Sequence, residues 1–180
     1  MIFYMDSNTI SLFTNVHEHI SRRIDIRSII ISSLLILVGA LAFYFSIKEE
    51  NESSSLSMLV MTLGTAMILV GVFRLFWKSH AWFYVPSQSK VVVKSEFYDA
   101  SDYRNLKQVL DNAVFSDSKS IKGSSTGGIR MDYMFSKDRK FVAVQLYQFS
   151  SYIYQPVTEV YYYKDMAAEK FIRCAEKRMF

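Results

Sequence analysis

The chain has 180 residues, of which 51% are hydrophobic, and a formal net charge of +4. Its single cysteine, Cys174, excludes an internal disulfide framework and lacks the paired spacing of a cysteine metal site. We interpret Cys174 as a small core residue rather than a nucleophile, because a nucleophile needs a positioned base. These averages resemble those of a soluble domain, but the apolar residues are distributed very unevenly along the chain.

Residues 1 to 27 form an N-terminal segment with an amphipathic pattern. Apolar residues recur at helical spacing between residues 8 and 26, which predicts an amphipathic helix. The helix is expected to lie on the inner leaflet or to pack on the soluble domain. Within it, His17 and His19 are two positions apart and point about 200° away from each other on a helix, so we predict no metal site here.

Two long apolar stretches follow this segment. Residues 28 to 47 contain no charge, and residues 56 to 78 contain only Arg74 and Lys78, close to the end. About 20 helical residues rise about 30 Å, the thickness of the hydrocarbon core of a bilayer. We therefore predict two transmembrane helices joined by a short external loop, residues 48 to 55. The alternative, two core helices of a soluble protein, usually shows a polar stripe and shorter apolar runs.

The first span also has features of a cleavable signal. Ala40-Leu41-Ala42 resembles a cleavage site, and Ser21-Arg22-Arg23 suggests a twin-arginine export signal. The apolar run is longer than the roughly 7 to 15 residues of a signal, and its leader contains acidic residues. We therefore predict an uncleaved anchor.

Basic residues next to the spans predict the orientation. They precede the first span and end the second, whereas the loop at residues 48 to 55 contains one lysine and three glutamates. Because cationic flanks are retained in the cytoplasm, we predict that both termini are cytoplasmic, in a bacterial inner membrane. The topology determinants are Arg22, Arg23, Arg27, Arg74 and Lys78.

Small residues recur seven positions apart in both spans. They are Ser32 and Gly39 in the first span, and Gly64 and Gly71 in the second. This spacing predicts close helix packing with a left-handed crossing. The small residues either pack the two spans on each other or form an oligomerisation seam.

Residues 83 to 180 predict one cytoplasmic α+β domain. An antiparallel sheet with helices packed on it is the economical arrangement. The expected strands are residues 90 to 99, 129 to 135, 140 to 149 and 158 to 163, and the expected helices are residues 101 to 113 and 165 to 178. Residues 116 to 128, rich in glycine and serine, are expected to form a flexible loop.

The strongest strand signal is a hairpin with a four-residue turn at residues 136 to 139. In this register Tyr133 faces Val142 and Arg130 faces Gln145. The expected core residues are Ile129, Met131, Tyr133, Val142, Val144 and Leu146. We expect the opposite face to be covered by the last helix, through Phe171 and Ile172, or by a partner protein. The candidate interaction face comprises Arg130, Asp132, Gln145 and Tyr147, next to Phe141, Ala143 and Phe149.

Several short motifs are spread over residues 82 to 165. They are Tyr84-Val85-Pro86, Phe97-Tyr98-Asp99, Gly128-Ile129-Arg130, Ser136-Lys137-Asp138, Val144-Gln145 and Tyr154-Gln155-Pro156-Val157-Thr158. Together they resemble an uncharacterised family of Bacteroidota membrane proteins with two spans and a C-terminal α+β domain. The resemblance implies no activity, cofactor or functional residue.

Patterns typical of enzymes or nucleic-acid-binding proteins occur without their companion features. Ser87 to Lys90 and Ser116 to Lys119 match the Ser-x-x-Lys pattern of acylating enzymes, but no companion motif accompanies them. Gly123 to Gly128 lacks the Gly-Lys-Ser/Thr ending of a phosphate-binding loop. The tyrosines suit base stacking, yet no basic stripe accompanies them. We predict neither an enzyme, a cofactor nor a nucleic-acid partner.

We therefore predict a noncatalytic, membrane-anchored adaptor or accessory subunit. Its expected partners are the lipid bilayer and a protein, either another protein or a second copy of the chain. The expected binding surface is the exposed sheet face or the loop at residues 116 to 128. The alternative is a membrane-bound sensor or binding module for a small ligand. A pocket with convergent charged groups would favour the sensor, and a flat aromatic patch would favour the adaptor.

Overall fold

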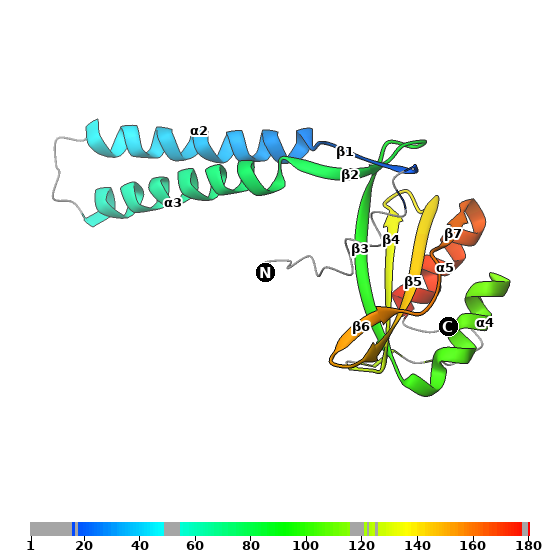
Figure 1. The fold of residues 1–180 in the computed structure, drawn as a ribbon. Helices are drawn as coiled ribbons and strands as arrows, with labels where there is room; N and C mark the ends of the chain where they lie inside the picture. Colours follow the sequence, from blue (N-terminus) through cyan, green and yellow to red (C-terminus); the bar gives the residue numbers. More distant parts are fainter. Residues whose placement is uncertain are drawn as a thin grey trace. The chain divides into compact units, whose positions relative to one another are not determined.

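A computed structural model describes residues 16, 18–48, 55–115, 121, 123–124, 126–177 and 180. The described residues divide into two compact units (Figure 1). One unit is Arg22–Ala81, and the other is Trp82–Phe180 together with the residues before Arg22. The first is a helical hairpin and the second contains most of the sheet, so the chain has an α+β fold, as predicted.

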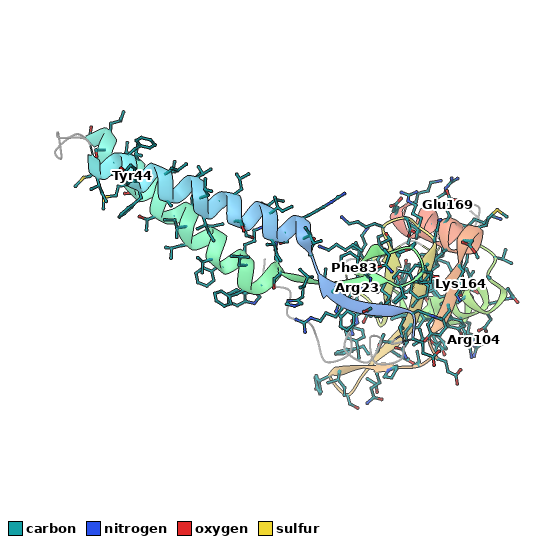
Figure 2. All side chains as sticks on the ribbon, turned by 90° about the horizontal axis from the view of Figure 1, so that it is seen from above. Arg23, Tyr44, Phe83, Arg104, Lys164 and Glu169 are labelled. Atoms are coloured by element: carbon teal, nitrogen blue, oxygen red, sulfur yellow. The ribbon has the colours of Figure 1, made fainter. Side chains whose placement is uncertain are left out.

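The helical unit consists of α2, Ile26–Lys48, and α3, Ser55–Lys78. Both helices are long and apolar enough to cross a membrane, and only 17% of each apolar window is buried. Large side chains project outward along the whole unit, with Tyr44 near the C-terminal end of α2 and Arg23 just before its start (Figure 2). A core helix of a soluble protein would bury these side chains, whereas this surface is compatible with lipid contact.

The predicted small residues form the contact between α2 and α3. Ser32, Gly39, Gly64 and Gly71 are all buried, and a Cβ added to Gly39 would lie 2.7 Å from the carbonyl oxygen of Gly64. Towards the loop end, two further serines cross-link the helices, because the hydroxyl of Ser46 donates to the carbonyl of Ser57 at 2.8 Å. The seam therefore joins the two helices of one chain.

The predicted N-terminal helix is wrong where the structure describes it. Strand β1 comprises Ile20–Ile24, and α2 begins immediately afterwards. Asp25 separates them and caps α2, because its side chain accepts the N–H of Ser28 at 3.4 Å. Its own N–H donates to Ser79 at 2.8 Å. Pairing with the chain that follows α3 thus overrides the helical spacing of the apolar residues. Residues 1–15 and 17, including His17, lie outside the described residues.

The remaining strands form an antiparallel sheet on which two helices pack. The strands are β2 His80–Tyr84, β3 Ser89–Tyr98, β4 Ile129–Ser136, β5 Phe141–Ser150, β6 Ile153–Pro156 and β7 Tyr161–Lys164, and the helices are the short η1 Ala100–Asp102, α4 Tyr103–Asn112 and α5 Asp165–Lys177. The strand order is β1-β2-β3-β4-β5-β6, and β7 pairs with β5. Four predicted strands and both helices are confirmed, although β7 begins three residues later than expected. The strands β2 and β6 were not predicted.

The core lies between the sheet and helices α4 and α5. All six predicted core residues of the β4–β5 hairpin belong to it, together with Leu106 and Leu110 of α4 and Phe171 and Ile172 of α5. Phe171 is surrounded by aromatic rings, including that of Tyr133 at 5.5 Å. Cys174 is buried in the same cluster, so its predicted place in the core is confirmed.

The register of the β4–β5 hairpin differs from the prediction. Tyr133 pairs with Val144 rather than Val142, and Arg130 pairs with Tyr147 rather than Gln145. Ser136 still belongs to β4, and its hydroxyl accepts the N–H of Phe141 at 3.0 Å, so the turn begins one residue later than expected. Because the offset moves each partner by two positions, every side chain keeps its face.

The second sheet face is covered by the beginning of its own unit. Phe141 belongs to a second apolar cluster with Val16, Ile20 and Tyr84, and the rings of Tyr84 and Phe141 stack at 4.6 Å. The prediction that Phe171 and Ile172 cover this face is therefore wrong, because α5 packs on the opposite, core face of the sheet.

Candidate interaction surfaces

The predicted interaction face is buried. Arg130, Asp132, Gln145 and Tyr147 are exposed by 7%, 0%, 5% and 0%. They do lie on one face of β4 and β5, as the alternation indicated. Alternation reports which residues share a face but not what covers it. This face is thus no accessible surface for a partner, and the prediction is corrected.

These residues instead form a polar cluster that holds β6 on the sheet. The guanidinium of Arg130 lies 3.0 Å from the carboxylate of Asp132, and its carbon is 5.1 Å from the ring centroid of Tyr147 and 4.8 Å from that of Tyr154. The hydroxyl of Tyr147 donates to Gln145 at 2.7 Å. A buried charge that is paired and stacked on aromatic rings is well compensated. Because Tyr154 belongs to β6 and pairs with Phe149, the cluster ties the β5–β6 hairpin to Arg130 of β4.

The β5–β6 hairpin ends in an exposed aromatic tip. Ser150 pairs with Ile153, so the turn is Ser151-Tyr152, with φ of 52° and 67°. Phe149, Tyr152 and Ile153, which we call the hairpin tip, are exposed by 48%, 94% and 56%. No charged residue occurs between Lys140 and Glu159. The sequence did not predict this hairpin, because Ser-Tyr is not a typical turn dipeptide. The stretch without charges was the signal for an apolar segment here.

A shallow groove lies beside the segment that joins β6 to β7. Its volume is about 630 Å³, and it is lined by Gln145, the segment Pro156–Val160 and Tyr162. Burial, followed by the negative charge of Glu18, raises the pKa of Tyr162. The amide of Gln145 is already engaged, because it donates to the carbonyl of Thr158 at 3.0 Å. Glu159 is the single charged residue in the lining, so the groove lacks convergent charged groups.

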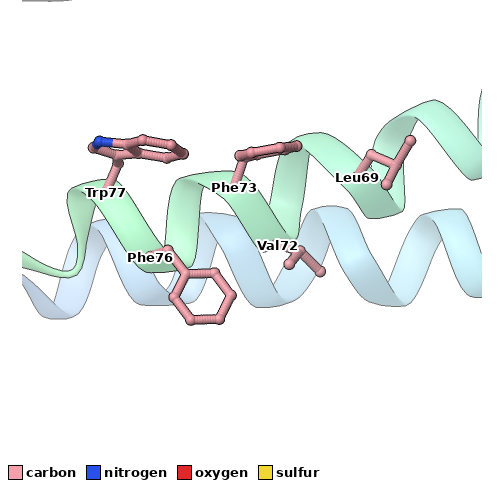
Figure 3. A pocket seen from close by; sticks show the side chains of 5 residues that line it. All are labelled: Leu69, Val72, Phe73, Phe76 and Trp77. Atoms are coloured by element: carbon pink, nitrogen blue, oxygen red, sulfur yellow. The ribbon is translucent and has the colours of Figure 1, made fainter.

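An apolar groove occurs on the outward side of α3 (Figure 3). Its volume is about 550 Å³, and its lining consists of Leu69, Val72, Phe73, Phe76 and Trp77. The rings of Phe73 and Trp77 stack at 5.6 Å. Phe76 and Trp77 are among the most exposed apolar residues of the unit, which suits the end of a membrane span.

The topology determinants gather at one end of the helical hairpin. Arg22 and Arg23 lie on β1, and Arg27 lies in the first turn of α2. Arg74 and Lys78 lie in the last turns of α3. The hydrogen bond from Asp25 to Ser79 brings these two ends of the chain together.

The loop at residues 116–128 is tied down where it is described. Ile121 is buried, and it exchanges two backbone hydrogen bonds with Phe180 at 3.0 and 3.4 Å. The N–H of Ser124 donates to the carbonyl of Phe97 at 2.8 Å. The Ser116 to Lys119 pattern lies outside the described residues. Across the part of the chain that the structure describes, His, Cys, Asp and Glu side chains form no group of three that could hold a metal ion.

Comparison with known protein families gives a match to part of the chain. A family model described as a domain of unknown function (DUF8460) matches residues 21–82. These residues contain the helical hairpin with most of β1, and the match ends within β2. No curated protein and no solved structure matches the chain. The resemblance to the Bacteroidota family rests on residues 82 to 165 and stays a prediction.

Proposed function

We propose that the protein is a noncatalytic, membrane-anchored adaptor or accessory subunit. Its two helices cross a bacterial inner membrane, both termini lie in the cytoplasm, and the hairpin tip binds a protein partner. The observation that carries the proposal is Tyr152, which is 94% exposed at a backbone conformation that disfavours a large side chain.

The helical unit supports the anchoring. Its small residues face each other and its large apolar residues face outward, which is the reverse of a soluble helix pair. Basic residues cluster at the end where the chain enters α2 and leaves α3. This end is expected to face the cytoplasm, because cationic flanks are retained there.

The hairpin tip supports partner binding. An aromatic residue with φ of 67° is less stable there than glycine, so folding stability alone does not explain Tyr152. Exposed tyrosines flanked by apolar residues are typical anchors of protein interfaces. The buried cluster around Arg130 holds both strands of the hairpin through Tyr147 and Tyr154, so little conformational entropy is lost when a partner binds.

The sensor alternative has weaker support. The groove beside Pro156–Val160 presents one carboxylate and no convergent charges, and its buried amide is already hydrogen-bonded within the domain. The aromatic hairpin tip matches the criterion for an adaptor instead.

Site-specific photocrosslinking in native membranes tests the adaptor role. A benzoylphenylalanine placed at Tyr152 is expected to yield one protein adduct of defined mass, identified by mass spectrometry. The same group at Lys107, exposed on α4, is the control and should not yield this adduct. Absence of any adduct at position 152, or identical adducts at both positions, would refute partner binding through the hairpin tip.

A further inference from the structure

The last two turns of α3 combine an apolar groove with two cations. The groove lined by Leu69, Phe73 and Trp77 reaches the final turn, where Trp77 is 76% exposed (Figure 3). Arg74 and Lys78 belong to the same turns: Arg74 is three residues before Trp77 of the groove, and Lys78 is four residues after Arg74. Side chains at such spacing are neighbours on a helix surface. An apolar surface thus ends beside positive charge.

The chain entering α2 adds more positive charge at this end. Because Asp25 donates its N–H to Ser79 at 2.8 Å, Arg23 and Arg27 lie close to the end of α3. Asp25 is the sole acidic residue described in the unit Arg22–Ala81, and its carboxylate is buried and accepts the N–H of Ser28. The described cations at this end therefore outnumber the one carboxylate, which already serves as a helix cap.

Arg74 is placed to receive an anion. Its side chain is half-buried, and its Nε is shielded without a hydrogen-bond partner among the described residues. Within the same residues no carboxylate lies within ion-pair distance of it. A half-buried guanidinium gains from a charged acceptor, and phosphate oxygens match its fork of N–H donors.

We propose that this end of the hairpin binds an anionic phospholipid. One acyl chain lies in the groove against Phe73 and Trp77, and the phosphate contacts Arg74 and Lys78. A zwitterionic lipid brings its own cation towards the basic residues, so the site prefers lipids with a net negative headgroup. The inference rests on the proposal that the helices span a bilayer, and it is independent of the adaptor role.

Fluorescence of Trp77 tests the site in the full-length chain. The chain has two tryptophans, so Trp82→Phe leaves Trp77 as the sole reporter. The protein is placed in phosphatidylcholine nanodiscs that contain an equal mole fraction of acyl-brominated phosphatidylglycerol or phosphatidylcholine. We expect the anionic bromolipid to quench Trp77 with an association constant at least about fivefold higher, since one Lys or Arg near a membrane surface contributes about that factor.

Three variants and one solution condition separate the charge from the fold. Arg74→Gln combined with Lys78→Gln should remove most of the preference, whereas Arg74→Lys and the surface control Lys107→Gln should retain it. Raising the salt from about 0.05 M to about 0.5 M should weaken the preference in the Trp82→Phe protein itself, so the test does not depend on the double variant folding.

The outcomes distinguish the lipid site from the membrane anchor. Equal quenching by both bromolipids would overturn the anionic site and leave the anchor standing. If neither bromolipid quenches Trp77, both the anionic site and the membrane anchor are overturned, because Trp77 would then lie away from the bilayer. A preference that survives high salt and the double variant would refute the assignment to Arg74 and Lys78.

Discussion

At the residue scale, Arg130 on β4 and Tyr152 in the turn of the β5–β6 hairpin show how one sheet uses polar and aromatic groups differently. Arg130 carries a charge into a buried face, where Asp132 pairs with it and the rings of Tyr147 and Tyr154 stack on it. Removing one partner of such a buried pair leaves an uncompensated charge, so the cluster constrains the whole hairpin. Tyr152 contributes almost nothing to the core, because it is 94% exposed.

The backbone at Tyr152 leads to a stability prediction. Tyr152→Gly is expected to raise the free energy of unfolding by about 1 kcal/mol, because glycine adopts a positive φ without steric cost. Thermal unfolding of the full chain in detergent measures this change. The matched control is Gln148→Gly on β5, which should lower the free energy of unfolding by about 0.5 to 1 kcal/mol. A destabilised Tyr152→Gly protein would show that the ring supports the fold and would weaken its proposed role in binding.

At the scale of elements, the seam between α2 and α3 depends on the absence of side chains. A Cβ on Gly39 would lie 2.7 Å from a backbone oxygen of Gly64, and a Cβ on Gly64 would lie 2.8 Å from the carbonyl oxygen of Gly39. Backbone atoms cannot rotate away as a side chain can, so the two helices would have to separate. The serine pair Ser46 and Ser57 adds hydrogen bonds that require the same close approach.

This contact predicts the effect of a larger residue at Gly39. Gly39→Leu is expected to lower the stability of the hairpin by about 1 to 3 kcal/mol, the usual cost of overpacking. Melting temperature in detergent measures the loss, and Ala40→Leu, on the exposed side of the same turn, serves as the control. If both variants have the melting temperature of the unmodified protein, the close packing of α2 on α3 is wrong.

At the scale of the whole molecule, the two units bury opposite kinds of residue. The helical unit buries glycine and serine and exposes large apolar side chains, whereas the other unit buries aromatic and aliphatic side chains. In water the second arrangement is stabilised by the hydrophobic effect, but the first is stable only where the surroundings are themselves apolar. This contrast within one chain favours a bilayer around α2 and α3 and water around the sheet.

The same contrast leads to a topology prediction. Reporter fusions at Phe180 and before Ser28 should both read as cytoplasmic, and a fusion within residues 48 to 55 should read as external. The basic residues at one end of the hairpin are the physical cause. An external reading at Phe180 would reverse the orientation and place the hairpin tip in the other compartment.

Local periodicity accounts for what could be predicted from the sequence. The apolar runs predicted both helices, the seven-residue spacing of small residues predicted their seam, and alternation placed Tyr133 and Arg130 on opposite faces of the sheet. The faces survived an error in the register, because a two-residue offset preserves alternation. Each of these features depends on residues that are neighbours in the sequence, so it could be read without knowing the fold.

Tertiary structure alone decided which segments cover which surfaces. Phe171 was expected on the second sheet face, but it packs with Tyr133 on the first, while Val16 and Tyr84 cover the second. Ile20 has helical spacing and yet lies on a strand, because pairing beside β2 satisfies its backbone. The apolar faces of several elements are similar in chemistry, so local pattern cannot choose between them, and the choice depends on long-range packing.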